Sequence, residues 1–241
     1  MKKTKEVETS SVPTLYRVTL SVTEDMLGTA PSNKQVYSDF VASRALSQEK
    51  KLAKTAEEKA AVAEKQEAVT REELALLPEE GTKGVTVFRR DANGLVLTDT
   101  MIRGFLKEGA GTMGANGSTW GLTTKIDRHI FVTDANKRPV RTLPIMRDGV
   151  QVTAADDIFE RPLRAQTMQG PRITLAASER IKAPVTLHFF IYLVGLAELG
   201  KNKPITPEIL EAWFQYGAYM GLGQYRTGGH GRFDATVEVV E

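Results

Sequence analysis

The chain has 241 residues, of which 41% are hydrophobic and 26% charged, a balance that suffices for a buried core. It contains no cysteine, which excludes disulfide bonds and thiolate metal sites. No stretch approaches the roughly 18 to 20 consecutive apolar residues of a membrane span, and the polar start MKKTKEVETSS predicts no signal peptide. We therefore expect a cytoplasmic protein with no membrane partner, no cofactor and no metal.

The net charge of +2 is unevenly distributed along the chain. Residues 48–80 carry six Lys or Arg against nine Asp or Glu, a balance of −3, which leaves +5 on the other 208 residues. Most of that excess lies in residues 120–190, with eleven basic and seven acidic residues. This permits a face that binds a polyanion, but it does not by itself argue for one.

Hydrophobic periodicity predicts the elements at the start of the chain. Leu15 to Val22 alternates apolar and polar residues, which predicts a half-buried strand. A short helical pattern follows over residues 34–45. Residues 48–80 are rich in Ala, Glu, Lys, Gln and Leu, which predicts solvated helices. We interpret 48–80 as a charged helical insertion within a single domain that spans 1–241.

Turn and capping signals divide the middle of the chain. Gly84 to Arg90 reads as a strand, and Asp91 to Gly94 is a turn because Asn-Gly is a strong hairpin signal. A helix begins at Thr98 or Asp99 and includes Leu106. Five glycines in the thirteen residues from Gly109 to Gly121 predict a loop.

The second half contains the most β-like run of the sequence. Val185 to Val194 is continuously apolar or aromatic apart from Thr186 and His188, which predicts a central strand. Further expected elements are a strand at Ile130–Val132, a turn at Asp134–Lys137, a helix that begins at Pro207 after the cap Thr206, and a closing strand at 234–241.

The loop between the last helix and the last strand is unusually rich in glycine. Five of the eleven residues from Gly221 to Gly231 are glycine. Such a loop can present successive backbone N–H groups to an anion. Arg226 and Arg232 carry forks suited to phosphate, and Tyr225 or Phe233 can stack on a base. The P-loop and dinucleotide fingerprints follow a strand and open a helix, whereas this loop follows a helix and opens a strand.

The order helix, G-L-G-x-x-R-x-x-G-x-G-R-F, strand resembles the glycine-rich loop of the RAMP superfamily, the RNA-binding proteins of CRISPR effector complexes. Residues 98–106 (TDTMIRGFL) are similar to the helix start of their backbone subunits. Arg103-Gly104 matches that motif, while Thr98-Asp99-Thr100 replaces its Pro-Gly-Ser. The strand after Pro184 also lies where the family has a core strand. The chain also looks like proteins of bacteriophages and prophages.

The resemblance implies an α+β fold, a ferredoxin-like (RRM-like) antiparallel sheet with a C-terminal glycine-rich loop. It implies binding of single-stranded RNA through the strand backbone, with further copies of the chain or CRISPR-complex subunits as partners. The nucleic-acid-binding residues that it implies are Arg103, Gly221, Gly223, Tyr225, Arg226, Gly228, Gly229, His230, Gly231 and Arg232.

Two other functions remain open from the sequence. An endoribonuclease of the same superfamily needs a general base, for which His129 and His230 are the candidates. Some backbone subunits cut RNA with a loop aspartate and a metal, a role that Asp25 or Asp39 matches by position. A phage structural protein, or an inhibitor that mimics a CRISPR subunit, is the other alternative. We expect binding rather than catalysis.

Overall fold

The computed structural model describes residues 15–32, 84–113, 122–167, 170–194 and 205–240, together with Ala75. The helices expected at 34–45 and 48–80 lie outside these residues, apart from Ala75. Within the described part, the fold is a mixed α+β structure in which antiparallel strand pairs dominate and few helices occur.

The largest sheet is built from strands that are distant in sequence. Its core order is β14 (Phe233–Val239), β1 (Leu15–Val22), β13 (Val185–Leu193) and β7 (Ile130–Thr133), and all three pairings are antiparallel. The three strands predicted at Leu15–Val22, Val185–Val194 and 234–241 therefore lie in one sheet. Two short strands, β9 (Met146–Arg147) and β10 (Val150–Gln151), extend the sheet beside β13.

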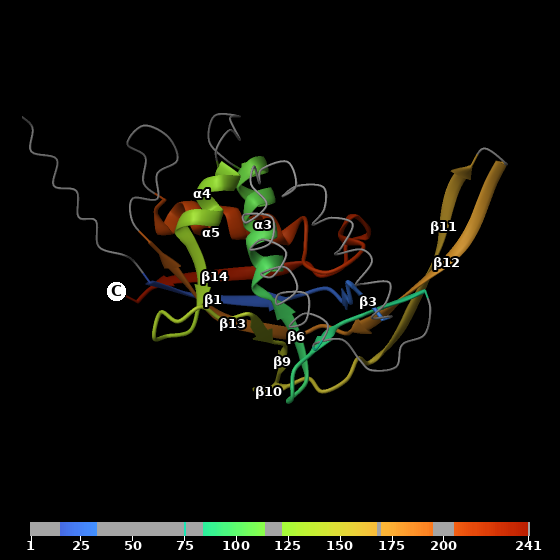
Figure 1. Cartoon of the computed structure of the whole chain (residues 1–241), viewed down its shortest axis with the longest axis horizontal. Helices are drawn as coiled ribbons and strands as arrows, with labels where there is room; N and C mark the ends of the chain where they lie inside the picture. The colour runs from blue at the N-terminus through green and yellow to red at the C-terminus, as the bar shows by residue number, and fades with distance from the viewer. Residues whose placement is uncertain are drawn as a thin grey trace, which may run out of the picture.

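Three helices lie over one face of this sheet: α3 (Asp99–Met113), α4 (Leu122–His129) and α5 (Pro207–Gln215) (Figure 1). The start of α5 follows the sequence signal, with Thr206 as an extended N-cap residue and Pro207 in the first turn. A hydrogen bond with Thr206 lowers the pKa of Glu208, the acidic residue of that turn. None of the described helices is long and apolar enough to cross a membrane.

Helix α3 continues further than the sequence predicts. The glycines from Gly109 onward were expected to form a loop, but the helix extends to Met113. A Cβ atom at Gly109 would lie 2.8 Å from the carbonyl oxygen of Trp213 on α5. Glycine at this position therefore allows two helix backbones to approach closely, and tertiary packing outweighs its low helix propensity.

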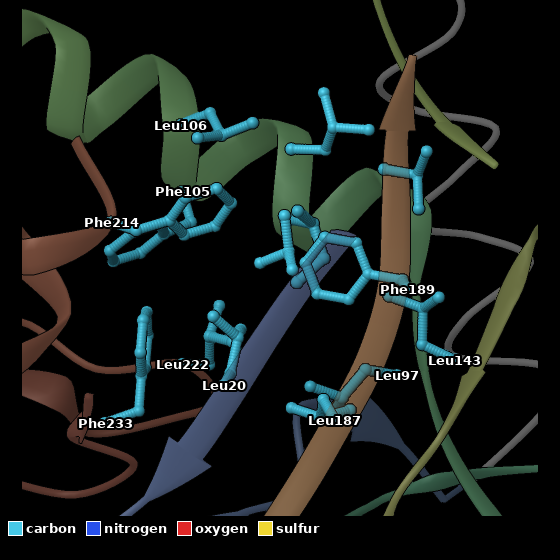
Figure 2. Close-up of a cluster of buried hydrophobic side chains, with 14 of the residues drawn as sticks. Leu20, Leu97, Phe105, Leu106, Leu143, Leu187, Phe189, Phe214, Leu222 and Phe233 are labelled. Atoms are coloured by element: carbon cyan, nitrogen blue, oxygen red, sulfur yellow. The ribbon is translucent and has the colours of Figure 1, made fainter. Parts of the chain in front are cut away.

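Aromatic rings from α3, from α5 and from the sheet meet in the core (Figure 2). The Phe105 ring on α3 lies 6.3 Å from that of Phe214 on α5 and 5.1 Å from that of Phe233 on β14. Phe189 on β13 contacts the same group through Phe214, with ring centroids 6.2 Å apart. Leu222 of the glycine-rich loop is also buried in this cluster, so the core holds one end of that loop.

The strand expected at Gly84–Arg90 is divided between two smaller sheets. Phe88 is buried between β4 (Val85–Val87) and β5 (Arg89–Arg90), and its amide donates to the Glu179 carboxylate at 2.8 Å. Because the Phe88 amide donates to a side chain, it cannot also donate to a neighbouring strand, and the strand is interrupted at Phe88. One sheet contains β11 (Asp157–Thr167), β12 (Gly170–Ile181), β4, β3 (Ala30–Pro31) and β2 (Met26–Leu27). The other contains β5, β6 (Leu95–Thr98) and β8 (Thr142–Pro144).

A long β-hairpin projects from the body of the molecule (Figure 1). It consists of β11 (Asp157–Thr167) and β12 (Gly170–Ile181), paired in register over their whole length. No strand was predicted here, because the mixture of basic and small residues hides the alternation. Its outer face carries large apolar side chains in solvent, with Ile173 68% and Leu175 65% exposed.

Two of the glycines of α3, Gly104 and Gly109, give a matched test of this packing. Gly104→Ala should stabilise the fold by up to about 1 kcal/mol, because a Cβ there meets nothing within 4 Å and alanine favours the helix. Gly109→Ala should instead destabilise it by about 1 to 3 kcal/mol through overlap with Trp213. Thermal melting should therefore move in opposite directions for the two variants. Equal shifts would contradict the close approach of α3 and α5.

Candidate nucleic-acid interface

The glycine-rich loop (Gly221–Gly231) is held by backbone hydrogen bonds to the segment that follows β1. The Gly231 amide donates to the Asp25 carbonyl at 2.9 Å, and the Gln224 amide donates to the Leu27 carbonyl at 3.1 Å. The loop also closes on itself, since the Leu222 amide donates to the Gly231 carbonyl at 2.9 Å. Its position is therefore fixed by main-chain groups.

Two glycines show why this docking needs residues without side chains. Gly223 has a φ of +93°, and a Cβ there would lie 2.6 Å from the Leu27 carbonyl oxygen. Gly231 has a φ of +70°, and its Cβ would overlap the Leu222 carbonyl oxygen. Both positions combine a left-handed backbone with a close main-chain neighbour, which only glycine accommodates without strain.

Five of the eleven amides of the loop are already hydrogen-bonded within the protein. The N–H groups that donate to carbonyl oxygens within the protein are those of Leu222, Gln224, Gly228, Gly229 and Gly231. These five amides are therefore not free to form the anion-binding nest expected from the glycine content. The side chain of Gln224 is also used internally, with its Oε1 2.6 Å from the Thr86 hydroxyl oxygen.

A stack of cations and aromatic rings joins the loop to the base of the β11–β12 hairpin. The Arg161 guanidinium lies over the Tyr225 ring at 3.9 Å, and the Tyr225 ring lies 5.5 Å from that of His230. His230 is in turn 4.9 Å from the Phe159 ring, over which Arg180 lies at 5.7 Å. Cation–π and aromatic contacts of this kind therefore orient the hairpin on the loop.

Charged groups brace the same junction. Arg180 forms a two-pronged pair with Asp157, with N–O distances of 2.6 and 2.7 Å, and it lies 3.5 Å from the Asp25 carboxylate. The hydrogen bond from Arg180 lowers the pKa of Asp157 to about 2. Lys182 adds a second cation at 3.3 Å from Asp157. The carboxylate form of Asp157 is therefore strongly favoured.

A groove of about 360 Å³ lies between α3 and the glycine-rich loop. Its lining residues are Thr29, Met101, Gly104, Phe105, Glu108, Leu222, Gly223 and Arg226. Among the described lining residues, Glu108 and Arg226 are the only charged ones, and they form an ion pair at 2.7 Å. Pockets with an apolar lining and a few convergent polar groups are typical of ligand sites.

The structure separates the arginines that the sequence groups together. Arg226 is paired with Glu108, and Arg103 is paired with Asp99 at 2.8 Å, one turn earlier on α3. Arg103 does not line the groove, although the next residue, Gly104, does. Arg232 is exposed and makes no ion pair with any described residue. It is therefore the loop cation most accessible to a phosphate.

The aromatic residues expected to stack on bases have different environments. Phe233 is fully buried in the core, so it cannot contact a ligand, contrary to expectation. Tyr225 is 38% exposed, with Arg161 over its ring. Phe190 and Tyr192, which the sequence favours as core, are half-buried on the sheet face opposite Phe189. The exposed face of Phe190 lies near Arg17, with the guanidinium 5.8 Å from the ring.

The candidate catalytic residues are not gathered in one place. The His230 Nδ1 lies 3.2 Å from the Asp25 carbonyl oxygen, whereas the His129 Nδ1, at the end of α4, lies 2.8 Å from the Val194 carbonyl oxygen. The Asp25 carboxylate accepts from the Ala183 amide at 3.1 Å and faces Arg180, so it has a structural role here. Asp39 lies outside the described residues. No cluster of three metal-ligating side chains occurs among the described residues.

Sequence reasoning missed the residues that complete this interface. Glu108, which the sequence did not single out, lies on α3, and Phe159 and Arg161 lie in a segment for which no strand was predicted. Two signals were available. Phe159 and Arg161 are two residues apart and hence lie on one face of a strand, and Gly170-Pro171 is a turn signal shortly after them. Their contact with a loop over 60 residues later depends on tertiary structure.

The low pKa of Asp157 predicts that acid weakens its ion pairs with Arg180 and Lys182. A group whose pKa falls on folding contributes stability above its unfolded value, near 3.9, and loses that contribution as pH falls toward the folded value. Asp157→Asn should therefore lower the melting temperature at pH 7, and its deficit should shrink between about pH 4 and pH 2. Melting curves of both proteins across this range measure the effect.

Asp234→Asn serves as the control, because Asp234 is exposed on β14 and makes no ion pair with a described residue. It should melt like the unaltered protein at every pH. A deficit for Asp157→Asn that stays constant down to pH 2 would contradict the assignment.

Comparison with known proteins adds no relative: no protein-family model matches the chain, and no curated protein matches it in sequence.

Proposed function

We propose that the protein binds single-stranded nucleic acid, in particular RNA, through contacts with the strand backbone. The observation that carries this is the position of the glycine-rich loop between two elements. On one side the loop lines a groove with α3, and on the other side it packs against the base of the β11–β12 hairpin through Tyr225 and His230. Arg232 offers a guanidinium fork that no described residue pairs with, and the Arg161 guanidinium lies over the Tyr225 ring. Cations beside aromatic planes suit phosphates and bases of a flexible strand.

We also propose that the fold is ferredoxin-like and that the chain is related to the RAMP superfamily. The sheet order β14–β1–β13–β7, with α3 and α4 between β1 and β7 and with α5 between β13 and β14, supports the first part. The loop motif and Arg103-Gly104 support the second. A cytoplasmic role in CRISPR-based antiviral defence, or in a phage that counters it, follows from that relationship.

Binding is favoured over cleavage by the surroundings of the histidines. His230 lies between the Tyr225 and Phe159 rings, where it packs the loop against the hairpin. Such a residue has a sufficient structural role without catalysis. His230→Ala provides the check: we expect weaker binding and no change in RNA integrity. Loss of an RNA-cutting activity with binding intact would establish the endoribonuclease alternative instead.

Arg232 gives the direct test of strand binding. If it makes one phosphate contact, Arg232→Ala should lower the slope of log affinity against log salt by about 0.7 on single-stranded RNA. The loss should be similar for different sequences, because phosphate contacts carry no base information. Arg226→Ala should change the slope less, since Glu108 already neutralises Arg226. Fluorescence anisotropy at several salt concentrations measures these slopes.

Arg128→Ala is the matched control, since Arg128 is an exposed arginine on α4 outside the loop. Its slope should equal that of the unaltered protein. Affinity and slope that do not change in Arg232→Ala would remove the loop from the interface. No detectable binding of any single strand by the unaltered protein would overturn the proposed function.

We propose further that copies of the chain associate along the strand, as the resemblance implies. The apolar ridge of the hairpin, formed by Ile158, Ile173 and Leu175, supports this proposal, because large exposed apolar side chains on one face mark contact surfaces. The double variant Ile173→Glu with Leu175→Glu should abolish multiple occupancy of a strand of about 30 to 40 nucleotides, which offers several sites.

Sedimentation with and without that RNA measures the stoichiometry. Thr174→Glu is the control, because Thr174 is exposed on the opposite face of the same strand. It should still load several protomers. One protomer per strand for the unaltered protein at saturating concentration would count against association along the strand.

A further inference from the structure

We infer that the groove between α3 and the glycine-rich loop is a base-reading pocket that takes a guanine from the bound strand. The inference rests on the proposed function, since it assigns one base of a single-stranded nucleic acid to this groove. It adds a sequence preference to a protein otherwise proposed to grip the backbone alone.

The size and lining of the groove suit a single flat ring system. Its volume of about 360 Å³ is at the small end of ligand pockets, which span roughly 300 to 1,000 Å³. The apolar lining includes Met101, which is half-buried, and the edges of Phe105 and Leu222, which are almost fully buried in the core. The Met101 sulfur also accepts a weak contact from the Thr29 hydroxyl at 3.9 Å. A polarisable thioether packs well against a planar base.

Glycine at two positions keeps the groove open. Gly104 lies on the wall formed by α3, and a Cβ there would meet nothing within 4 Å. Gly223 lies on the opposite wall, formed by the loop. A side chain longer than alanine at Gly104 would therefore extend into open space within the groove. The glycine at position 104 therefore leaves unfilled the part of the groove that a side chain at this position would occupy.

The charge inside the groove excludes phosphate and admits a base. The Glu108 carboxylate would repel a phosphate placed beside Arg226, to which it is already bound at 2.7 Å. Phosphates are therefore left to cations outside the groove, such as Arg232. A neutral base avoids this repulsion and can use the hydrogen-bonding capacity that the ion pair leaves unfilled.

That remaining capacity matches the edge of guanine. Glu108 accepts from Arg226 through Oε2 and from the Tyr216 hydroxyl through Oε1 at a long 3.5 Å, while a carboxylate has about four acceptor sites. Guanine alone among the four RNA bases offers two adjacent N–H donors, at N1 and N2, to such an acceptor. Its neighbouring O6 accepts from a guanidinium, which Arg226 supplies.

The test uses an oligouridine of about 12 nucleotides in which one central base is varied. Guanine should bind roughly tenfold more tightly than adenine at that position, because a bidentate pair discriminates to this extent. Inosine is the matched ligand, since it lacks only the N2 amino group of guanine. It should lose most of the preference. Fluorescence anisotropy at one fixed salt concentration gives the three affinities.

Two variants connect the preference to the groove. Glu108→Gln cannot accept both N–H groups, so the guanine preference should fall to less than about twofold while overall affinity is kept or rises. Glu24→Gln makes the same charge change on an exposed residue beside the loop and should keep the full preference. Gly104→Leu fills the groove and should abolish the preference even if Glu108→Gln fails to fold.

The outcomes separate this inference from the proposed function. Equal affinities for guanine, inosine and adenine in the strand would overturn the guanine pocket and leave strand binding intact. Guanosine and inosine 5′-monophosphates provide a second measurement by calorimetry. If no strand binds but guanosine monophosphate binds more tightly than inosine monophosphate, the pocket is supported and the proposed function is overturned. If neither binds, both are overturned.

Discussion

The candidate nucleic-acid interface depends on one close main-chain contact, in which the glycine-rich loop lies against the segment from Asp25 to Leu27. Gly231 donates to the Asp25 carbonyl while its own carbonyl accepts from Leu222, so three stretches of backbone share a small volume. Side chains cannot occupy this volume, which explains the glycines better than flexibility does. The same contact brings Leu222 into the aromatic core and thereby ties the loop to α3 and β14.

Fixing the loop in this way positions everything that the proposed function requires. One side of the loop faces α3 across the groove, and the other side stacks on the hairpin through Tyr225 and His230. Because five of the loop amides are already bonded within the protein, the proposed phosphate contacts are assigned to side chains, chiefly Arg232, and not to a backbone nest. In the proposed function, backbone contact and base recognition are therefore assigned to different groups.

Much of the sheet was accessible from the sequence because its signals are local. Period-two alternation in Leu15–Val22 and the apolar run of β13 predict strands without reference to any neighbour. The turn at Asp91 was equally readable, since its carboxylate accepts from the Asn93 and Gly94 amides. Prediction failed where distant contacts decide, as at Gly109, where packing against Trp213 keeps a glycine in a helix.

The sequence by itself determined that a glycine-rich loop with Arg226, and Arg232 directly after it, follows a helix that begins at Pro207, because spacing and residue type are properties of one segment. Only the tertiary structure decided how those residues are used. It paired Arg226 with Glu108, buried Phe233, left Arg232 exposed and placed Arg161 on Tyr225. Each of these contacts joins elements far apart in the chain. Their geometry depends on how the helices and sheets pack, which local sequence patterns do not encode.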